Sequence, residues 1–215
     1  MSEEIVVVVS GGESPDPRAA SAAPPGAPVV AADKGLEHAL SLGLDVSLAI
    51  GDFDSAAPEA VAVAESAGVR IERYPEAKDA SDLELALDAA AALEPLRILV
   101  LAGEGGRLDH QLSTLLLLAS ERYAGMQVDA LVGHRRVHVV RVARTLEGAP
   151  GELVSLLAVG GPAEGVTTVG LAYPLRGETL EAGTSRGVSN VFAMDTAHLA
   201  LEGGVLLAIR PGALK

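Results

Sequence analysis

The stretch VSLAIGDFDS (residues 46–55) places two carboxylates, Asp52 and Asp54, directly after a short apolar run. Such a run is typical of a strand buried on both faces of a parallel sheet. A buried strand gives little structural reason for two charges at its end, because Asp is rarely found inside a protein. The stretch therefore predicts a parallel sheet with an acidic edge.

Alternating strand-like and helix-like segments surround this stretch through the first half of the chain. The predicted strands cover residues 4–9, 28–33, 46–52, 69–75 and 96–103. The predicted helices cover residues 34–44, 58–68, 81–95 and 109–123. Strand–helix alternation indicates a mostly parallel sheet covered by helices on both faces. The N-terminal part is therefore expected to be an α/β domain.

Local signals mark where the predicted helices begin and end. Pro58 suits a first helical position, and Gly43 and Gly68 suit helix ends. Ser81 followed by Glu84 forms a capping box. A segment rich in Pro, Ser and Ala at residues 10–28 is expected to be a loop with at most a short helix.

After about residue 126 the pattern changes to short β-rich segments separated by Gly, Pro and charged turns. These segments cover residues 126–133, 136–142, 152–161, 165–175, 189–195 and 204–211. No convincing helical pattern interrupts them, which predicts an all-β sandwich domain at the C-terminus. The expected domains are residues 1–125 and 126–215.

Composition excludes several classes of protein. The formal net charge of −13 argues against a general binder of nucleic acids or membrane surfaces, because both require a basic face. The absence of Cys excludes disulfides, thiolate zinc sites and Cys nucleophiles. The acidic N-terminus does not resemble a secretory signal, and no apolar run reaches membrane-spanning length. We therefore expect a cytoplasmic protein.

Polar side chains gather where the predicted parallel strands end, which is where open α/β sheets bind ligands. They are Asp33, Asp52, Asp54, Lys78, Asp79, Asp82, Arg107, Asp109 and His110. Taken singly, each has an ordinary explanation as a helix cap, a turn former or a solvated charge. The glycine-rich turn at residues 103–107 also lacks the GK[ST] of a P-loop.

Together, these strand ends predict a site for phosphoryl transfer. Carboxylates crowded on one edge repel each other and require a cation, and hard oxygen ligands suit Mg²⁺. Arg107 and Lys78 are then expected to bind phosphate oxygens. Catalysis of phosphoryl transfer depends mostly on such positioning and charge stabilisation.

Several motifs, taken in order, resemble the thiamine pyrophosphokinase family. They are ADKG (32–35), GDFDS (51–55), KDASDLELAL (78–87), GGRLDHQLS (105–113) and GVSNVF (187–192). The resemblance implies an ATP-binding catalytic domain over residues 1–125 and a thiamine-binding β-sandwich over residues 126–215. It also implies a homodimer with thiamine bound between subunits. The implied reaction transfers pyrophosphate from ATP to thiamine, giving thiamine diphosphate and AMP.

The resemblance also implies roles for individual residues. The implied catalytic residues are Asp52, Asp54, Asp82 and Asp109, and the implied Mg²⁺ ligands are Asp52, Asp54 and Asp79. The implied ATP-binding residues are Asp33, Lys78, Asp79, Arg107 and His110, and the implied thiamine contacts are Ser189 and Asn190. Asp79, Asp82 and Asp33 serve either as metal ligands or as acceptors for the attacking hydroxyl. Asp109 orients either the metal or the substrate alcohol.

Departures from the family pattern keep two alternatives open. The run DKGLE (33–37) carries Lys34 and Glu37 where the family usually has other residues, and the chain has no Trp to stack on thiamine. Tyr173 and Phe192 are the only late aromatic residues that can replace it. One alternative is a pyrophosphokinase for another alcohol such as a pterin, and the other is a non-catalytic sensor of nucleotide or thiamine.

Overall fold

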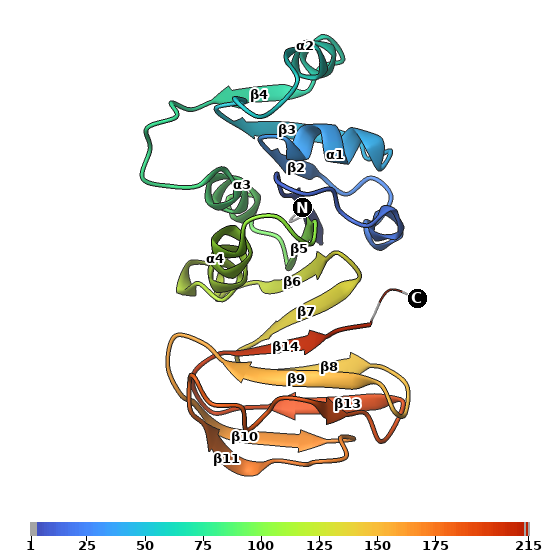
Figure 1. The fold of residues 1–215 in the computed structure, drawn as a ribbon, viewed down its shortest axis with the longest axis vertical. Coiled ribbons are helices and arrows are strands. Elements are labelled where there is room, and N and C mark those ends of the chain that lie inside the picture. Colours follow the sequence, from blue (N-terminus) through green and yellow to red (C-terminus); the bar gives the residue numbers. More distant parts are fainter. Residues whose placement is uncertain (1–3, 213, 215) are drawn as a thin grey trace. The chain divides into compact units, whose positions relative to one another are not determined.

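The protein is described by a computed structural model that covers residues 4–212 and residue 214. Within these residues the chain forms two compact units (Figure 1). The first unit contains the residues up to 117 together with 128–133, and the second contains 118–127 together with the residues from 134 onward. The chain therefore passes between the units three times.

A mostly parallel sheet forms the centre of the first unit. Its strands are β1 (Ile5–Val9), β2 (Val29–Ala32), β3 (Val46–Gly51), β4 (Arg70–Arg73), β5 (Arg97–Ala102) and β6 (Gln127–Val132). They lie in the order β6-β5-β1-β2-β3-β4, and the strands from β1 to β5 all pair in parallel. The α/β organisation predicted from the alternating segments is thus confirmed.

Helices connect these strands and begin and end close to the predicted signals. They are the 3₁₀ helix η1 (Pro17–Ala22), α1 (Gly35–Ser41), α2 (Pro58–Ser66), α3 (Asp82–Ala91) and α4 (Leu108–Leu118). The Ser81 hydroxyl accepts a hydrogen bond from the Glu84 backbone N–H at 3.2 Å, as a helix N-cap does. Helices α1 and α3 both pack against β1, β2 and β3. Their connections run in opposite directions across the strand order, and right-handed crossovers therefore place them on opposite faces.

The strand order creates a switch point beside β1. From β1 the chain proceeds to β2, β3 and β4 on one side, and then returns to β5 on the other side. The loops that follow β1 and β5 meet at this point, where a Cβ added to Gly103 would lie 2.0 Å from the carbonyl oxygen of Glu13. Open α/β sheets bind ligands at the carboxyl ends of their strands beside such a switch point.

The second unit consists of two antiparallel sheets and the short 3₁₀ helix η2 (Glu121–Tyr123). One sheet has the order β12-β9-β14-β7, and the other has the order β11-β10-β13-β8. The strands are β7 (Arg135–Val140), β8 (Ala143–Glu147), β9 (Leu153–Ala158), β10 (Ala163–Val169), β11 (Arg176–Leu180), β12 (Asn190–Val191), β13 (Thr196–Ala200) and β14 (Leu206–Arg210). Strands β8, β11 and β13 lie outside the segments that the sequence predicts.

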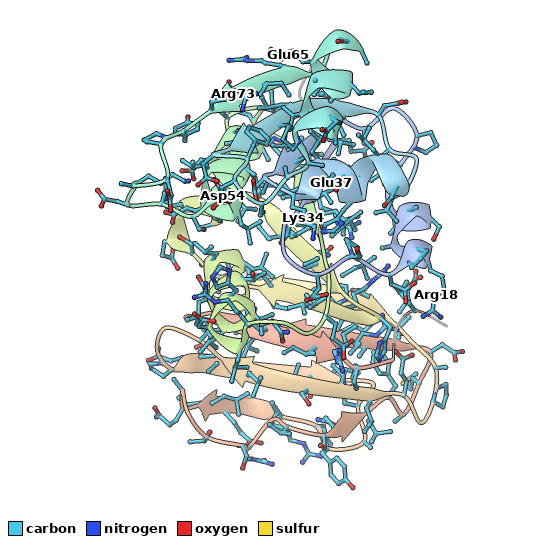
Figure 2. The ribbon with its side chains drawn as sticks, turned by 45° about the horizontal axis from the view of Figure 1, so that its top comes forward. Arg18, Lys34, Glu37, Asp54, Glu65 and Arg73 are labelled. Atoms are coloured by element: carbon cyan, nitrogen blue, oxygen red, sulfur yellow. The ribbon has the colours of Figure 1, made fainter. Side chains whose placement is uncertain are left out.

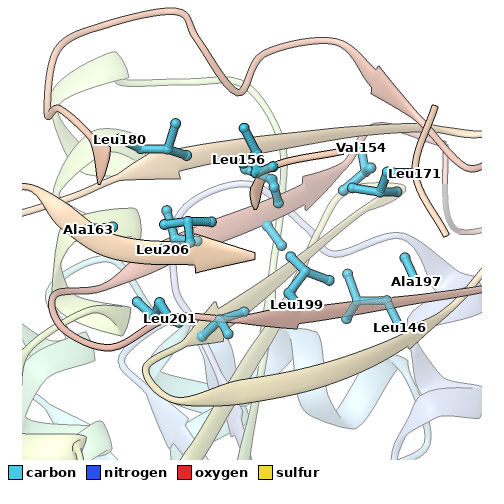
Figure 3. Close-up of a cluster of buried hydrophobic side chains, with 14 of the residues drawn as sticks. Leu146, Val154, Leu156, Ala163, Leu171, Leu180, Ala197, Leu199, Leu201 and Leu206 are labelled. Atoms are coloured by element: carbon cyan, nitrogen blue, oxygen red, sulfur yellow. The ribbon is translucent and has the colours of Figure 1, made fainter. Parts of the chain in front are cut away.

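One apolar core joins the two sheets of the second unit (Figure 3). Leu156 and Leu206 come from the first sheet, and Leu146 and Leu199 come from the second. Packing of two sheets over a shared core defines a β-sandwich, which confirms the predicted C-terminal architecture. Among the described residues, no helix combines the length and the apolar character needed to cross a membrane.

Candidate active site

Three aspartates meet at the carboxyl ends of β2 and β3 in the first unit. Asp33 follows β2, and Asp52 and Asp54 follow β3. Each offers a carboxylate oxygen, and these oxygens all lie within 4.8 Å of one another. We call this group the acidic cluster. One of its members, Asp54, is labelled in Figure 2.

Asp33 is the buried member of the acidic cluster. Its backbone adopts a positive φ of 48°, and its side chain is only 8% exposed. One carboxylate oxygen, Oδ2, accepts a hydrogen bond from the Ser55 hydroxyl. The other, Oδ1, is buried with no hydrogen-bond partner. A buried acceptor without a partner is costly, so a cation beside Oδ1 would satisfy it.

Backbone strain and a close approach bring the three carboxylates together. Phe53, between the two aspartates that follow β3, adopts a positive φ of 58°, and its ring is buried against α1 and α2. The Arg73 guanidinium lies 5.2 Å from the centre of this ring. Positive φ is unfavourable for a bulky residue, and such strain concentrates at functional sites. Gly51 supplies the close approach, because a Cβ there would lie 3.0 Å from the Cα of Asp33.

Lys78 and Asp82 extend the acidic cluster on one side. The Lys78 ammonium lies 2.7 Å from Asp52 Oδ2 and 3.1 Å from Asp82 Oδ1. Lys78 comes from the segment between β4 and α3, and Asp82 is the first residue of α3. Separate loops of the sheet edge therefore converge on one site.

The pKa values of these carboxyl groups reflect their crowding. The hydrogen bond from Lys78 lowers the pKa of Asp52, and the charge of Asp52 in turn raises the pKa of Asp54. Burial is the main cause that raises the pKa of Asp82, although Lys78 opposes it. Negative charge thus exceeds positive charge locally, which favours binding of a cation.

The acidic cluster fits a hard divalent cation better than a soft one. All of its donors are carboxylate oxygens, the ligand type that Mg²⁺ prefers. Asp79, one of the expected metal ligands, is exposed and lies outside this group, whereas Asp33 lies inside it. Among the residues that the structure describes, this is the one group of acidic and His side chains with metal-binding geometry.

A second part of the predicted site lies at the start of α4. Arg107 and Asp109 are exposed and form a two-pronged ion pair, with Nη2 2.6 Å from Oδ2 and Nε 3.2 Å from Oδ1. The hydrogen bonds from Arg107 lower the pKa of Asp109 to about 2. His110 is exposed on the same turn. Within the described chain, no hydrogen bond or ion pair joins Arg107 or Asp109 to the acidic cluster.

Asn190 has a structural task in the second unit. Its side chain is buried, Oδ1 accepts a hydrogen bond from the backbone N–H of Tyr173 at 3.1 Å, and Nδ2 donates one to the Tyr173 carbonyl at 2.8 Å. The neighbouring Ser189 is exposed and adopts a positive φ of 59°. The Tyr173 side chain is 65% exposed, whereas Phe192 is only 1% exposed. Of the two late aromatic residues, only Tyr173 can therefore meet a ligand.

Sequence reasoning missed two residues that shape the site. Ser55 is the hydrogen-bond partner of Asp33, and its place within GDFDS was the available signal. Glu37 (labelled in Figure 2), a departure from the family pattern, accepts a hydrogen bond from the backbone N–H of Ala57 at 2.8 Å, just before α2. Its carboxylate thus satisfies a free N–H at the start of that helix.

Comparison with known proteins divides the chain into two functional parts. Residues 26–129 match the family model described as thiamin pyrophosphokinase, catalytic domain. Residues 137–206 match the model described as thiamin pyrophosphokinase, vitamin B1 binding domain. The chain is thus of the class of transferases that joins an α/β catalytic part to a β-sandwich binding part. Since the two models together match well over half of the chain, it belongs to the thiamine pyrophosphokinase family.

Individual relatives agree with this assignment. Thiamine pyrophosphokinase of Bacillus subtilis is 27% identical over 193 residues, which cover 84% of this chain and 86% of the relative. Its crystal structure matches with a TM-score of 0.84 at 24% identity, covering 96% of this chain and 98% of that one. Thiamin pyrophosphokinase of Geobacillus thermodenitrificans matches with a TM-score of 0.80 at 25% identity and 96% coverage of both chains.

The close approach at Gly51 predicts a specific loss of stability. We expect Gly51→Ala to lower the free energy of unfolding by about 1–3 kcal/mol, because the new Cβ overpacks against Asp33. Urea denaturation measures this change. Gly125→Ala is the matched control, since a Cβ there has nothing within 4 Å, and it should change stability by about 0.5 kcal/mol or less. Equal effects of the two substitutions would contradict the close approach.

Proposed function

We propose that this chain is a thiamine pyrophosphokinase that uses ATP. The thiamine hydroxyl oxygen forms a bond to the β-phosphorus, the bond between that phosphorus and the α-phosphate oxygen breaks, and AMP leaves. The observation that supports this most strongly is the acidic cluster at the edge of a sheet matched by the family's catalytic domain. The negative charge of the acidic cluster suits a cation, and that cation would in turn hold the phosphates of ATP.

We propose Mg²⁺ as the resident metal, held by Asp33, Asp52 and Asp54. The buried and unpartnered Oδ1 of Asp33 supports this assignment. The metal would supply neutralisation of charge on the phosphate oxygens. Asp79 is exposed and suits a role toward ATP from the loop before α3.

The chain's own residues supply the remaining steps. We propose that Asp82 accepts the hydroxyl proton, since burial raises the pKa of its carboxyl group and favours proton uptake. Arg107 and Lys78 bind phosphate oxygens, Arg107 as a two-pronged donor and Lys78 as a point charge. Asp109 and His110 follow Arg107 in the first turn of α4, and Asp109 already orients its guanidinium.

We propose that thiamine binds to the second unit, which the vitamin B1 binding model matches. Ser189 offers an exposed hydroxyl, and Tyr173 offers an exposed aromatic face for the thiamine cation. Asn190 acts through Tyr173 by fixing its backbone. No finding favours the pterin or sensor alternatives. Glu37, one of the departures from the family pattern that motivated them, has a structural role as an acceptor for the Ala57 backbone N–H.

We also propose a homodimer. Leu108, Leu112 and Leu116 lie four residues apart along α4 and are 78%, 55% and 49% exposed. This spacing places them on one face of the helix. A second copy that presents the same face would cover these leucines in a two-fold contact. A cytoplasmic location stays a prediction.

The proposed reaction predicts release of AMP that depends on thiamine and on Asp54. With ATP and Mg²⁺, we expect one AMP for each thiamine diphosphate formed, measured by chromatography. Asp54→Asn should lower this rate at least about a hundredfold, because it removes a charge from the acidic cluster. Asp45→Asn, at the opposite end of β3, is the control and should keep the rate. AMP release with a pterin alcohol but not with thiamine would contradict the proposed acceptor.

The proposed role of Tyr173 predicts a selective effect on thiamine. Tyr173→Leu should raise the KM for thiamine about five- to thirtyfold through loss of the aromatic face, and should leave the KM for ATP unchanged. Steady-state kinetics with each substrate varied measures both values. Tyr173→Phe should retain most of the affinity for thiamine. An equal loss in both variants would refute stacking on the ring.

The exposed leucines of α4 predict how the chain sediments. The wild type should sediment at twice the 21.8 kDa mass of one chain, and Leu112→Glu should sediment as a monomer, because a buried charge opposes the contact. Sedimentation velocity distinguishes the two masses. Leu93→Glu, at an exposed leucine outside α4, should remain dimeric. A dimeric Leu112→Glu variant would place the interface elsewhere.

A further inference from the structure

Lys78 follows a run of exposed residues, but its own side chain is largely buried. Residues 73–77 before it are exposed, yet the Lys78 side chain is only 13% exposed. Its ammonium contacts Asp52 Oδ2 at 2.7 Å, Asp82 Oδ1 at 3.1 Å and the Pro75 carbonyl at 3.3 Å. The ammonium group thus donates two hydrogen bonds, to Asp52 and to Pro75, and forms a second ion pair with Asp82.

Lys78 is charged in this position. Its ammonium lies between the carboxylates of Asp52 and Asp82, and two adjacent negative charges favour the protonated form of a lysine. Among the described residues, it is the one cation that forms an ion pair with the acidic cluster. It therefore neutralises part of the negative charge that a bound metal ion would neutralise.

Asp52 is the residue that both cations need. Its Oδ2 is engaged by Lys78, and its Oδ1 accepts a hydrogen bond from the Asp54 backbone N–H at 3.2 Å. A divalent cation in the acidic cluster would meet Asp52 with a unit positive charge already on that carboxylate. Two cations on one carboxylate repel each other, so entry of the second weakens the hold of the first.

We propose that Lys78 is a tethered counter-ion of the metal site, which holds Asp52 in place before the metal arrives and transfers to the phosphates of ATP when metal and nucleotide bind. This inference rests on the proposed function, because it takes the acidic cluster as the metal site. It makes the segment of residues 74–81 sensitive to ligands, since Lys78 also bonds the Pro75 carbonyl of that segment. Binding at the acidic cluster is thereby coupled to the loop between β4 and α3.

The direct test is calorimetric titration of Mn²⁺ into the protein without nucleotide. Lys78→Met keeps the length of the side chain and removes its charge. We expect this variant to bind Mn²⁺ about tenfold more tightly than the wild type, because the competing charge is gone. Lys78→Arg, which keeps the charge, should bind Mn²⁺ about as the wild type does. Arg70→Met is the control, because it removes a positive charge from an exposed ion pair on β4 and should leave Mn²⁺ affinity unchanged.

Hydrogen exchange provides a second readout, which does not depend on turnover. Mn²⁺ with a non-hydrolysable ATP analogue should change exchange within residues 74–81 in the wild type, and this change should be lost in Lys78→Met. Unchanged or weaker Mn²⁺ binding by Lys78→Met, with its circular dichroism and melting temperature intact, would overturn the counter-ion role alone. Absence of Mn²⁺ binding by the wild type would overturn this role and the metal site together, whereas AMP release tests the proposed reaction separately.

Discussion

The structure depends on holding three carboxylates within 4.8 Å of one another at the edge of a parallel sheet. Like charges at this spacing repel, and one of their oxygens, Oδ1 of Asp33, is buried without a partner. The fold accepts this arrangement through positive φ values at Asp33 and Phe53 and through the missing side chain at Gly51. Positive φ at these two positions, one of them a bulky residue, indicates that this edge of the sheet serves binding.

The two units divide the work of the proposed reaction. The first unit supplies charge, since the acidic cluster, Lys78 and Asp82 lie together at the ends of its strands. The second unit supplies a rigid apolar sandwich from which exposed groups such as Ser189 and Tyr173 project. There the buried amide of Asn190 holds the backbone of Tyr173, whose side chain is exposed. The catalytic model and the vitamin B1 binding model of the family match these two parts of the chain separately.

Much of the fold could be predicted from the sequence because, in the first half of the chain, the pattern of apolar residues in strand-like segments differs clearly from that in helix-like segments. The second sheet of the sandwich was largely missed for a physical reason: its strands are short and half exposed, and β8 buries only Leu146. The acidic cluster was predicted in outline, since strand ends converge in a parallel sheet. The sequence does not determine which further aspartate lies beside Asp52 and Asp54, because the exposure of Asp79 and the burial of Asp33 depend on loop conformation. Likewise the resemblance implies a thiamine contact for Asn190 but gives no sign that its amide bonds the backbone of Tyr173.

The central claim is that these separate strand ends fold into one cation site for the phosphates of ATP. A crystal structure of the protein with Mn²⁺ and a non-hydrolysable ATP analogue tests it most directly, since Mn²⁺ is located by its anomalous scattering. The account predicts an anomalous peak in contact with oxygens of Asp33, Asp52 and Asp54 and with the phosphates of the analogue. A peak away from these three aspartates, or a nucleotide bound elsewhere, would contradict it.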